Sequence, residues 1–114
     1  MRNRLKEILS HGETALGMTV CISHPFIAEA VGKVGFDFIN FDTQHSPMSM
    51  EKAEQLLEAM SFSQTTPLIR VEWNDFAAIN HALDIGAHGV IVPFINTKED
   101  AKKSVKYASY PPRG

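Results

Sequence analysis

The chain has 114 residues, of which 44% are hydrophobic and 21% charged, with 11 basic against 13 acidic side chains. This length leaves room for one small domain or part of one. Nucleic acid is excluded as the main partner because no basic block could neutralise a row of phosphates. A membrane is excluded because no apolar run approaches the ~18 residues of a span. Without a secretory signal, and with a single cysteine that cannot form an internal disulfide, a cytoplasmic location is expected.

The first half of the chain contains two β-rich runs, each followed by a helical pattern. The first run covers residues 19–23, and Pro25 then suits the first turn of a helix that Gly35 ends. The second run, residues 36–42, alternates like a strand and leads into a turn with Ser49 as a candidate N-cap. The helix after this cap has an apolar stripe: Met50, Ala53, Leu57 and Met60.

The second half repeats the same alternation. Residues 67–72 predict a third strand, and the helix after it ends at Gly86, where a left-handed C-terminal cap is expected. Residues 89–93 are almost continuously apolar, as buried parallel strands are. Thr97 is a candidate cap for a last helix, with Asp100 at the spacing of a capping box.

Four strands, each followed by a helix, predict an α/β fold of parallel βα units with right-handed crossovers. The chain stops in a loop at residues 110–114, directly after the fourth unit. We therefore expect an unfinished sheet with open edges at its first and fourth strands.

Chemically useful side chains follow the second and third strands, and in parallel βα folds such groups gather at the carboxyl ends of strands. Asp42 could accept a hydrogen bond from one ring nitrogen of His45 and leave the other as a base near neutral pH. Alternatively, Asp42 caps backbone amides and the ring is solvated. Arg70 lies in an apolar run and needs an anionic partner. That partner is either a substrate carboxylate or phosphate, or the side chain of Asp42 or Glu72.

Other candidates have structural alternatives that are at least as plausible. His24 could line the same edge or begin a helix, whereas surface or structural roles are expected for His81 and His88. Trp73 and Phe94 could stack on a ligand, although packing is the default for both. The sequence contains no glycine-rich phosphate loop and no Cys/His metal cluster.

Taken together, the segments of this chain resemble the HpcH/HpaI family of metal-dependent (class II) 2-oxo-acid (pyruvate) aldolases. This family includes dihydroxyheptenedioate and 2-keto-3-deoxy-sugar-acid aldolases. The similarity runs in register over essentially the whole chain, and ordered matches at successive units are more specific than any one motif. The matching segments are residues 3–6, 23–29, 35–47, 67–71, 83–87, 89–93 and 110–114.

The resemblance implies a TIM (β/α)₈ barrel of roughly 250 residues. Residues 1–114 would then be a single partial domain, a half-barrel that contains the first four units. The implied activity is that of a lyase, which cleaves a 2-oxo-4-hydroxy acid reversibly to pyruvate and an aldehyde. By position, Asp42 and His45 would form the acid/base dyad, and Arg70 would hold and polarise the pyruvyl group.

The chain departs from the family in two ways. Gln44 stands where many relatives have Glu, which removes a negative charge beside the dyad. The family also implies a divalent cation (Mg, Mn or Co), but its Glu and Asp ligands lie on later strands, so no residue here is assigned to a metal. The expected partners are a small 2-oxo acid and an aldehyde, with a homo-oligomer or a complementing C-terminal half. The alternative is a non-catalytic half-barrel that binds a small carboxylate or pairs with a partner chain.

Overall fold

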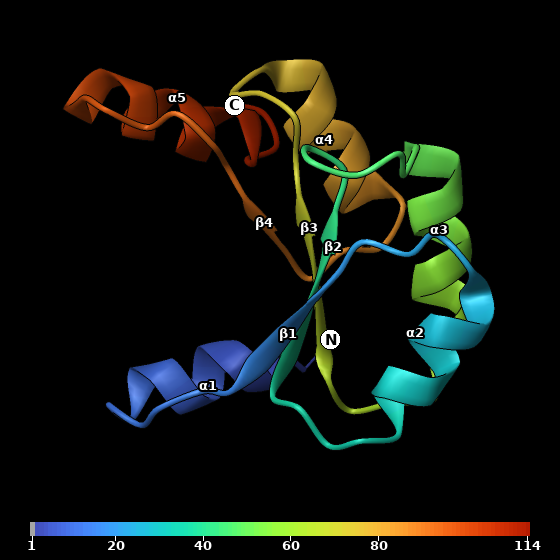
Figure 1. Cartoon of the computed structure of the whole chain (residues 1–114). Helices are drawn as coiled ribbons and strands as arrows, with labels where there is room; N and C mark the ends of the chain where they lie inside the picture. Colours follow the sequence, from blue (N-terminus) through green and yellow to red (C-terminus); the bar gives the residue numbers. More distant parts are fainter. Residues whose placement is uncertain (1) are drawn as a thin grey trace.

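The computed structural model describes residues 2–114 and contains a sheet of four parallel strands that alternate with helices (Figure 1). The strand order is β1-β2-β3-β4, so each crossover joins neighbouring strands. This arrangement confirms the predicted parallel α/β fold. In chain order the elements are α1 (Arg4–Ser10), β1 (Gly17–Val20), α2 (Pro25–Gly32), β2 (Phe38–Asp42), α3 (Met50–Ala59), β3 (Thr66–Arg70), α4 (Phe76–Asp84), β4 (Gly89–Ile91) and α5 (Lys98–Tyr107).

The helix starts follow the predicted capping chemistry. The Ser49 side chain accepts the backbone N–H of Lys52 at the start of α3. At the start of α5, Thr97 and Asp100 form a reciprocal capping box. The ring of His24 accepts the N–H of Phe26 and so begins α2, which is the structural one of its two predicted roles. These local bonds satisfy N–H groups that a helix leaves free in its first turn.

Helix α1 was not predicted, because its seven residues carry no clear apolar stripe and none of them is buried. The Asn3 side chain caps it by accepting the N–H of Lys6. Tertiary bonds hold it to the sheet: the Leu5 N–H donates to Thr66 Oγ1 at 3.0 Å, and Arg4 pairs with Asp37 at 3.1 Å. A segment this short is helical only with such support.

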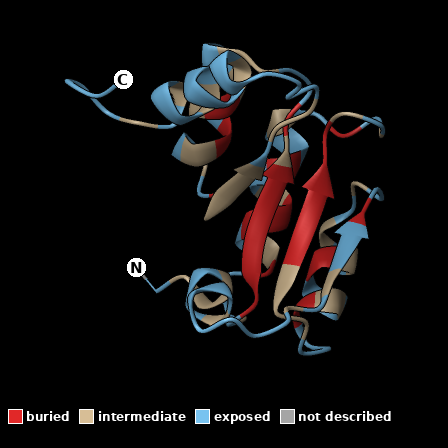
Figure 2. Ribbon diagram, turned by 90° about the vertical axis from the view of Figure 1, so that its left-hand side faces the viewer, coloured by how far each residue is buried: buried red, intermediate tan, exposed pale blue. Residues whose placement is uncertain are grey.

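The core lies between the central strands and helices α2, α3 and α4. Figure 2 shows β2 and β3 mostly buried, whereas β1 at the edge is largely exposed. The fully buried side chains Ile39, Phe41 and Ile69 pack against helix residues of the same core. The core residues contributed by helices α2 to α4 are Ala28, Ala53, Leu56, Leu57, Ile79 and Ala82.

The register of the sheet decides which side chains lie together on the face opposite helices α2, α3 and α4. In a parallel pair, residues that are opposite one another point to the same side, and successive residues alternate. Asp42 is the partner of Arg70, and Phe38 is the partner of Gly17. A Cβ at Gly17 would lie 2.3 Å from the Phe38 ring, so only glycine admits this ring.

Among residues 2–114, no helix has the length and apolar character that a membrane crossing requires.

Candidate active site

Asp42, the last residue of β2, is the centre of the hydrogen-bond network at the carboxyl end of the sheet. Its side chain is only 1% exposed. Oδ1 accepts the backbone N–H of Gln44 at 2.8 Å and that of His45 at 3.0 Å. Arg70 donates to both carboxylate oxygens, from Nε to Oδ1 at 3.1 Å and from Nη2 to Oδ2. The carboxylate therefore fixes both the turn that follows β2 and the side chain at the end of β3.

This network keeps both members of the pair charged. Hydrogen bonding to Arg70 holds the pKa of Asp42 well below its usual range, and the two backbone N–H groups act in the same direction against the opposing effect of burial. The carboxylate in turn raises the pKa of Arg70. Of the partners considered from the sequence, Asp42 is the one that Arg70 has in this structure.

His45 is connected to Asp42 through its backbone and not through its ring. The hydrogen bond between the two residues uses the His45 N–H, and the side chain lies exposed at the turn. Among residues 2–114, no hydrogen bond joins the imidazole to the carboxylate. The structure thus corresponds to the second sequence alternative, in which Asp42 caps backbone amides. The imidazole is left exposed at this turn.

Arg70 retains binding capacity after it has paired with Asp42. The pair uses Nε and Nη2, and within the described residues Nη1 has no hydrogen-bond partner. The side chain is 30% exposed, so it can be reached from solvent. A guanidinium with free N–H groups is a good donor for a carboxylate or a polarised carbonyl oxygen.

Residues after β1, β3 and β4 complete this edge of the sheet. The exposed Cys21 directly follows β1, with its Sγ 3.9 Å from Oδ2 of Asp42. Trp73 and Phe94 form an aromatic pair with ring centroids 5.0 Å apart, and both rings are more than half exposed. Phe94 has a φ of +60°, an uncommon backbone conformation for a residue with a side chain. The edge therefore combines a charged pair, an imidazole, a thiol and exposed aromatic rings.

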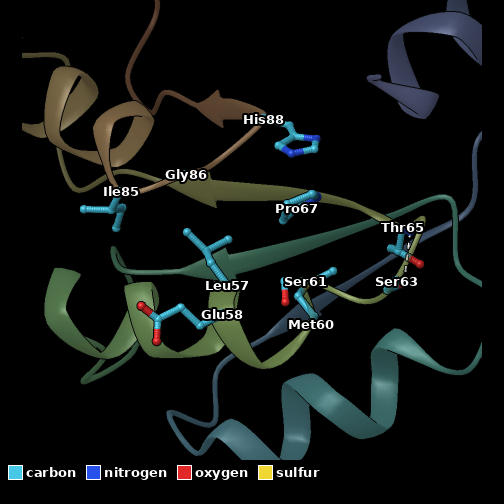
Figure 3. A pocket seen from close by; sticks show the side chains of 10 residues that line it. All are labelled: Leu57, Glu58, Met60, Ser61, Ser63, Thr65, Pro67, Ile85, Gly86 and His88. Atoms are coloured by element: carbon cyan, nitrogen blue, oxygen red, sulfur yellow. Dashed lines mark hydrogen bonds between the residues drawn. The ribbon is translucent and has the colours of Figure 1, made fainter. Parts of the chain in front are cut away.

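His81 and His88 lie outside this group, as predicted. His81 is an exposed residue of α4. His88 lines a cavity of about 280 Å³ between the ends of α3 and α4 and the start of β3 (Figure 3). Its Nδ1 is buried without a hydrogen-bond partner in the described chain, and burial lowers its pKa. None of Asp42, His45 and Arg70 lines this cavity.

The described residues do not by themselves form a complete site for the divalent cation that the family resemblance implies. Within residues 2–114, no group of three His, Cys, Asp or Glu side chains could hold a metal ion. The most buried carboxylate of this edge, Asp42, already accepts bonds from Arg70 and two backbone amides. No metal ligand can be assigned to this part of the chain.

Sequence reasoning missed two hydroxyl groups that support the pair. Thr43 donates its Oγ1–H to the backbone oxygen of Arg70 at 2.7 Å, and Ser46 donates its hydroxyl to the backbone oxygen of Asp42. Hydroxyl residues are common after strands, so their type alone carries little signal. Their position within the four residues after Asp42 was the only available indication.

Comparison with known proteins identifies relatives for nearly the whole chain. Residues 16–114 match the family model described as HpcH/HpaI aldolase/citrate lyase. The chain is 36% identical over 112 residues to a hydroxypyruvate/pyruvate aldolase of Roseobacter denitrificans, covering 98% of this chain and 44% of that protein. It is 31% identical over 114 residues to a 4-hydroxy-2-oxo-heptane-1,7-dioate aldolase of Salmonella arizonae, covering 100% and 43%.

A solved structure shows the same arrangement of strands and helices. A HpcH/HpaI aldolase/citrate lyase family protein from Burkholderia cenocepacia superposes with a TM-score of 0.93 at 28% identity. The match covers 99% of this chain and 47% of that one. The chain thus spans less than half the length of the relatives it matches, and it corresponds to about half of their fold.

Proposed function

We propose that this chain, which belongs to the HpcH/HpaI aldolase/citrate lyase family, forms the N-terminal half of a (β/α)₈ barrel lyase. The activity proposed for the whole protein is reversible aldol cleavage of a 2-oxo-4-hydroxy acid to pyruvate and an aldehyde. The observation that carries this proposal is the Asp42–Arg70 pair at the carboxyl end of the sheet, which leaves one guanidinium nitrogen free, with the exposed His45 in the turn that Asp42 caps.

Arg70 is proposed to bind the 2-oxo acid. Asp42 holds the guanidinium through Nε and Nη2, so the direction of the remaining Nη1 donors is set before substrate arrives. These donors would contact an oxygen of the pyruvyl group, on which negative charge increases as the carbon–carbon bond breaks. Such a preorganised donor stabilises the transition state more than the ground state.

His45 is proposed as the base. Its neutral imidazole would take the proton of the C4 hydroxyl, the oxygen would form the aldehyde carbonyl, and the electrons of the C3–C4 bond would pass to the pyruvate enolate. Protonation at C3 then gives pyruvate. Asp42 stays ionised in this scheme. It acts in the proposed dyad by holding the His45 backbone and Arg70, and it does not itself transfer the proton.

Residues 2–114 contain no group of three His, Cys, Asp or Glu side chains that could by themselves hold the cation that the resemblance implies. We propose that Mg, Mn or Co, if used, is held by residues of the half that this chain does not contain, and no step is derived through it. Cytoplasmic location and homo-oligomer formation stay predictions from the sequence.

A chimera tests the proposed activity. Residues 1–114 would be joined to the C-terminal half of the Roseobacter denitrificans aldolase, and retro-aldol turnover would be measured with added Mg²⁺, Mn²⁺ or Co²⁺. We expect Arg70→Met and His45→Gln each to lower kcat/KM by at least about 100-fold.

Arg4→Met and His81→Gln are matched controls, because these residues lie away from the proposed site, and they should leave kcat/KM of the chimera unchanged. An active chimera that tolerates Arg70→Met without loss would contradict the binding role of Arg70. Turnover by residues 1–114 alone would contradict the placement of essential groups in the other half.

The second candidate function is a non-catalytic half-barrel that pairs with another chain. It is favoured by the edges of β1 and β4, each of which is paired with a strand on one side only within residues 2–114. Unpaired strand edges are templates for association. Sedimentation of residues 1–114 alone and with the separate C-terminal half of the relative distinguishes self-pairing, complementation and a monomer that binds neither.

A further inference from the structure

Thr43 makes two hydrogen bonds to a single backbone carbonyl at the end of β3. Its backbone N–H lies 3.1 Å from the Arg70 oxygen, and its Oγ1 lies 2.7 Å from the same oxygen. The residue is 3% exposed, so neither bond competes with bulk water. Together the two donors occupy both lone pairs of the Arg70 carbonyl.

This contact lies at the carboxyl ends of β2 and β3, just beyond their last paired residues. Strand β2 ends at Asp42 and β3 ends at Arg70, and these two residues are opposite one another in the register. Beyond the last paired residues, the strands of a sheet are free to separate. Thr43 directly follows β2, and its bonds hold the two strand ends together where the carboxylate and the guanidinium meet.

We propose that Thr43 is a positioning residue for the proposed 2-oxo-acid site, and that its hydroxyl fixes the Arg70 backbone so that the guanidinium stays paired with Asp42. This inference rests on the proposed function for its link to substrate. The contact that it concerns exists without substrate. Thr43 touches no reacting atom in this scheme and acts only through Arg70.

The chain contains a matched control for this hydroxyl. Thr65 is 5% exposed, and its Oγ1 donates to the backbone oxygen of Phe36 at 2.8 Å. This bond has the same donor type and acceptor type as that of Thr43 and differs from it in length by 0.1 Å, but it lies at the amino end of the sheet, directly before β3. Replacing either threonine by valine removes one buried hydroxyl bond and keeps the side-chain shape.

The test uses the 114-residue chain itself and three measurements. Urea unfolding measures stability, ¹⁵N NMR measures hydrogen exchange at Arg70 Nε–H, and a pyruvate titration followed by NMR measures binding at the same group. We expect Thr43→Val and Thr65→Val each to lower the folding equilibrium constant about 3- to 30-fold, as is typical of a lost buried hydrogen bond with its acceptor left behind.

Only Thr43→Val should change hydrogen exchange at the Arg70 Nε–H. We expect exchange at its Nε–H to become at least about tenfold faster than in Thr65→Val, since freeing one buried hydrogen bond corresponds to a population shift of this order. The affinity of Thr43→Val for pyruvate should also fall. Thr43→Ser, which keeps the hydroxyl, should show the exchange rate and the pyruvate affinity of the wild type. If Thr43→Val does not fold, Thr43→Ala against Thr65→Ala gives the same comparison.

Equal Nε–H exchange in the Thr43 and Thr65 variants would overturn the proposal, since the Thr43 hydroxyl would then be a stabilising bond without influence on Arg70. Faster exchange in Thr43→Val, with no pyruvate binding even to the wild-type chain, would support the positioning contact and contradict its link to the proposed function. Pyruvate binding that is equal in wild type and Thr43→Val would support the carboxylate site and overturn the positioning role.

Discussion

The sheet carries an aspartate–arginine pair at each end, and the two pairs differ in what surrounds them. At the amino end, Arg4 of α1 pairs with Asp37 at 3.1 Å, and the other oxygen of Asp37 accepts the Leu16 N–H at 2.9 Å. At the carboxyl end, Arg70 pairs with Asp42, which also accepts two backbone N–H groups. Both carboxylates therefore join a guanidinium to neighbouring backbone.

The difference lies in what each pair connects, since both arginines keep N–H groups that their aspartate partner does not use. The Arg4–Asp37 pair connects α1, the segment before β1 and the residue before β2, so its bonds serve to attach one element to another. The carboxyl-end pair joins adjacent strands that the sheet already connects, and the thiol of the exposed Cys21 lies 3.9 Å from Oδ2 of Asp42. The comparison teaches that open donors alone do not distinguish the two arginines, and that the carboxyl-end pair is the candidate for binding because it joins strands that are already connected.

The largest expected effect is that of Asp42→Asn. The amide can still accept the backbone N–H groups, but its NH₂ then faces the Arg70 guanidinium in a buried position. We expect the free energy of unfolding to fall by about 2–4 kcal/mol in urea denaturation. Asp37→Asn, at the more exposed amino-end pair, should lower it by about 1 kcal/mol or less. Equal losses from the two variants would remove the energetic distinction between the pairs.

Acid titration sharpens the same comparison. The folded chain holds the pKa of Asp42 below its usual value of 3.8, so below that pH the unfolded chain binds more protons than the folded one. The stability that Asp42 contributes is therefore complete above about pH 4 and is lost as the pH falls towards the lower pKa of the folded state. Stability measured from pH 6 to 2 should decline less steeply in Asp42→Asn than in wild type. If stability declines equally with pH in wild type and Asp42→Asn, the lowered pKa of Asp42 is contradicted.

The smallest expected effect is that of Arg4→Met at the amino end. Because Arg4 is partly exposed, the loss of its pair with Asp37 should lower the free energy of unfolding by about 0.5–1 kcal/mol. Amide exchange in α1 should become faster, since this helix depends on tertiary bonds, while exchange at Arg70 Nε–H should not change. A change at Arg70 would show that the two ends of the sheet are coupled.

The sequence predicted the elements that local chemistry dictates. Ser49, Thr97 and Asp100 have the capping roles expected of them, the run at residues 36–42 contains β2, and the run at residues 67–72 overlaps β3 (Thr66–Arg70). Strand ends were less accurate: β1 ends at Val20, three residues before the end of the predicted strand. Strand limits depend on pairing with neighbours, which periodicity does not encode. The same reasoning explains why α1, whose residues find their partners in the sheet, was missed.

For the site, the sequence determined which strand ends carry Asp42, His45 and Arg70, because alternating β and helical patterns fix the direction of every strand and parallel strands bring their carboxyl ends to one edge. Tertiary structure alone decided how the three residues interact. Whether Asp42 bonds to the ring or the backbone of His45, and whether Arg70 meets Asp42 or Glu72, depends on a register in which one residue of slip turns a side chain to the opposite face. No local pattern in the chain specifies that register, because it results from the packing of whole strands and helices against one another.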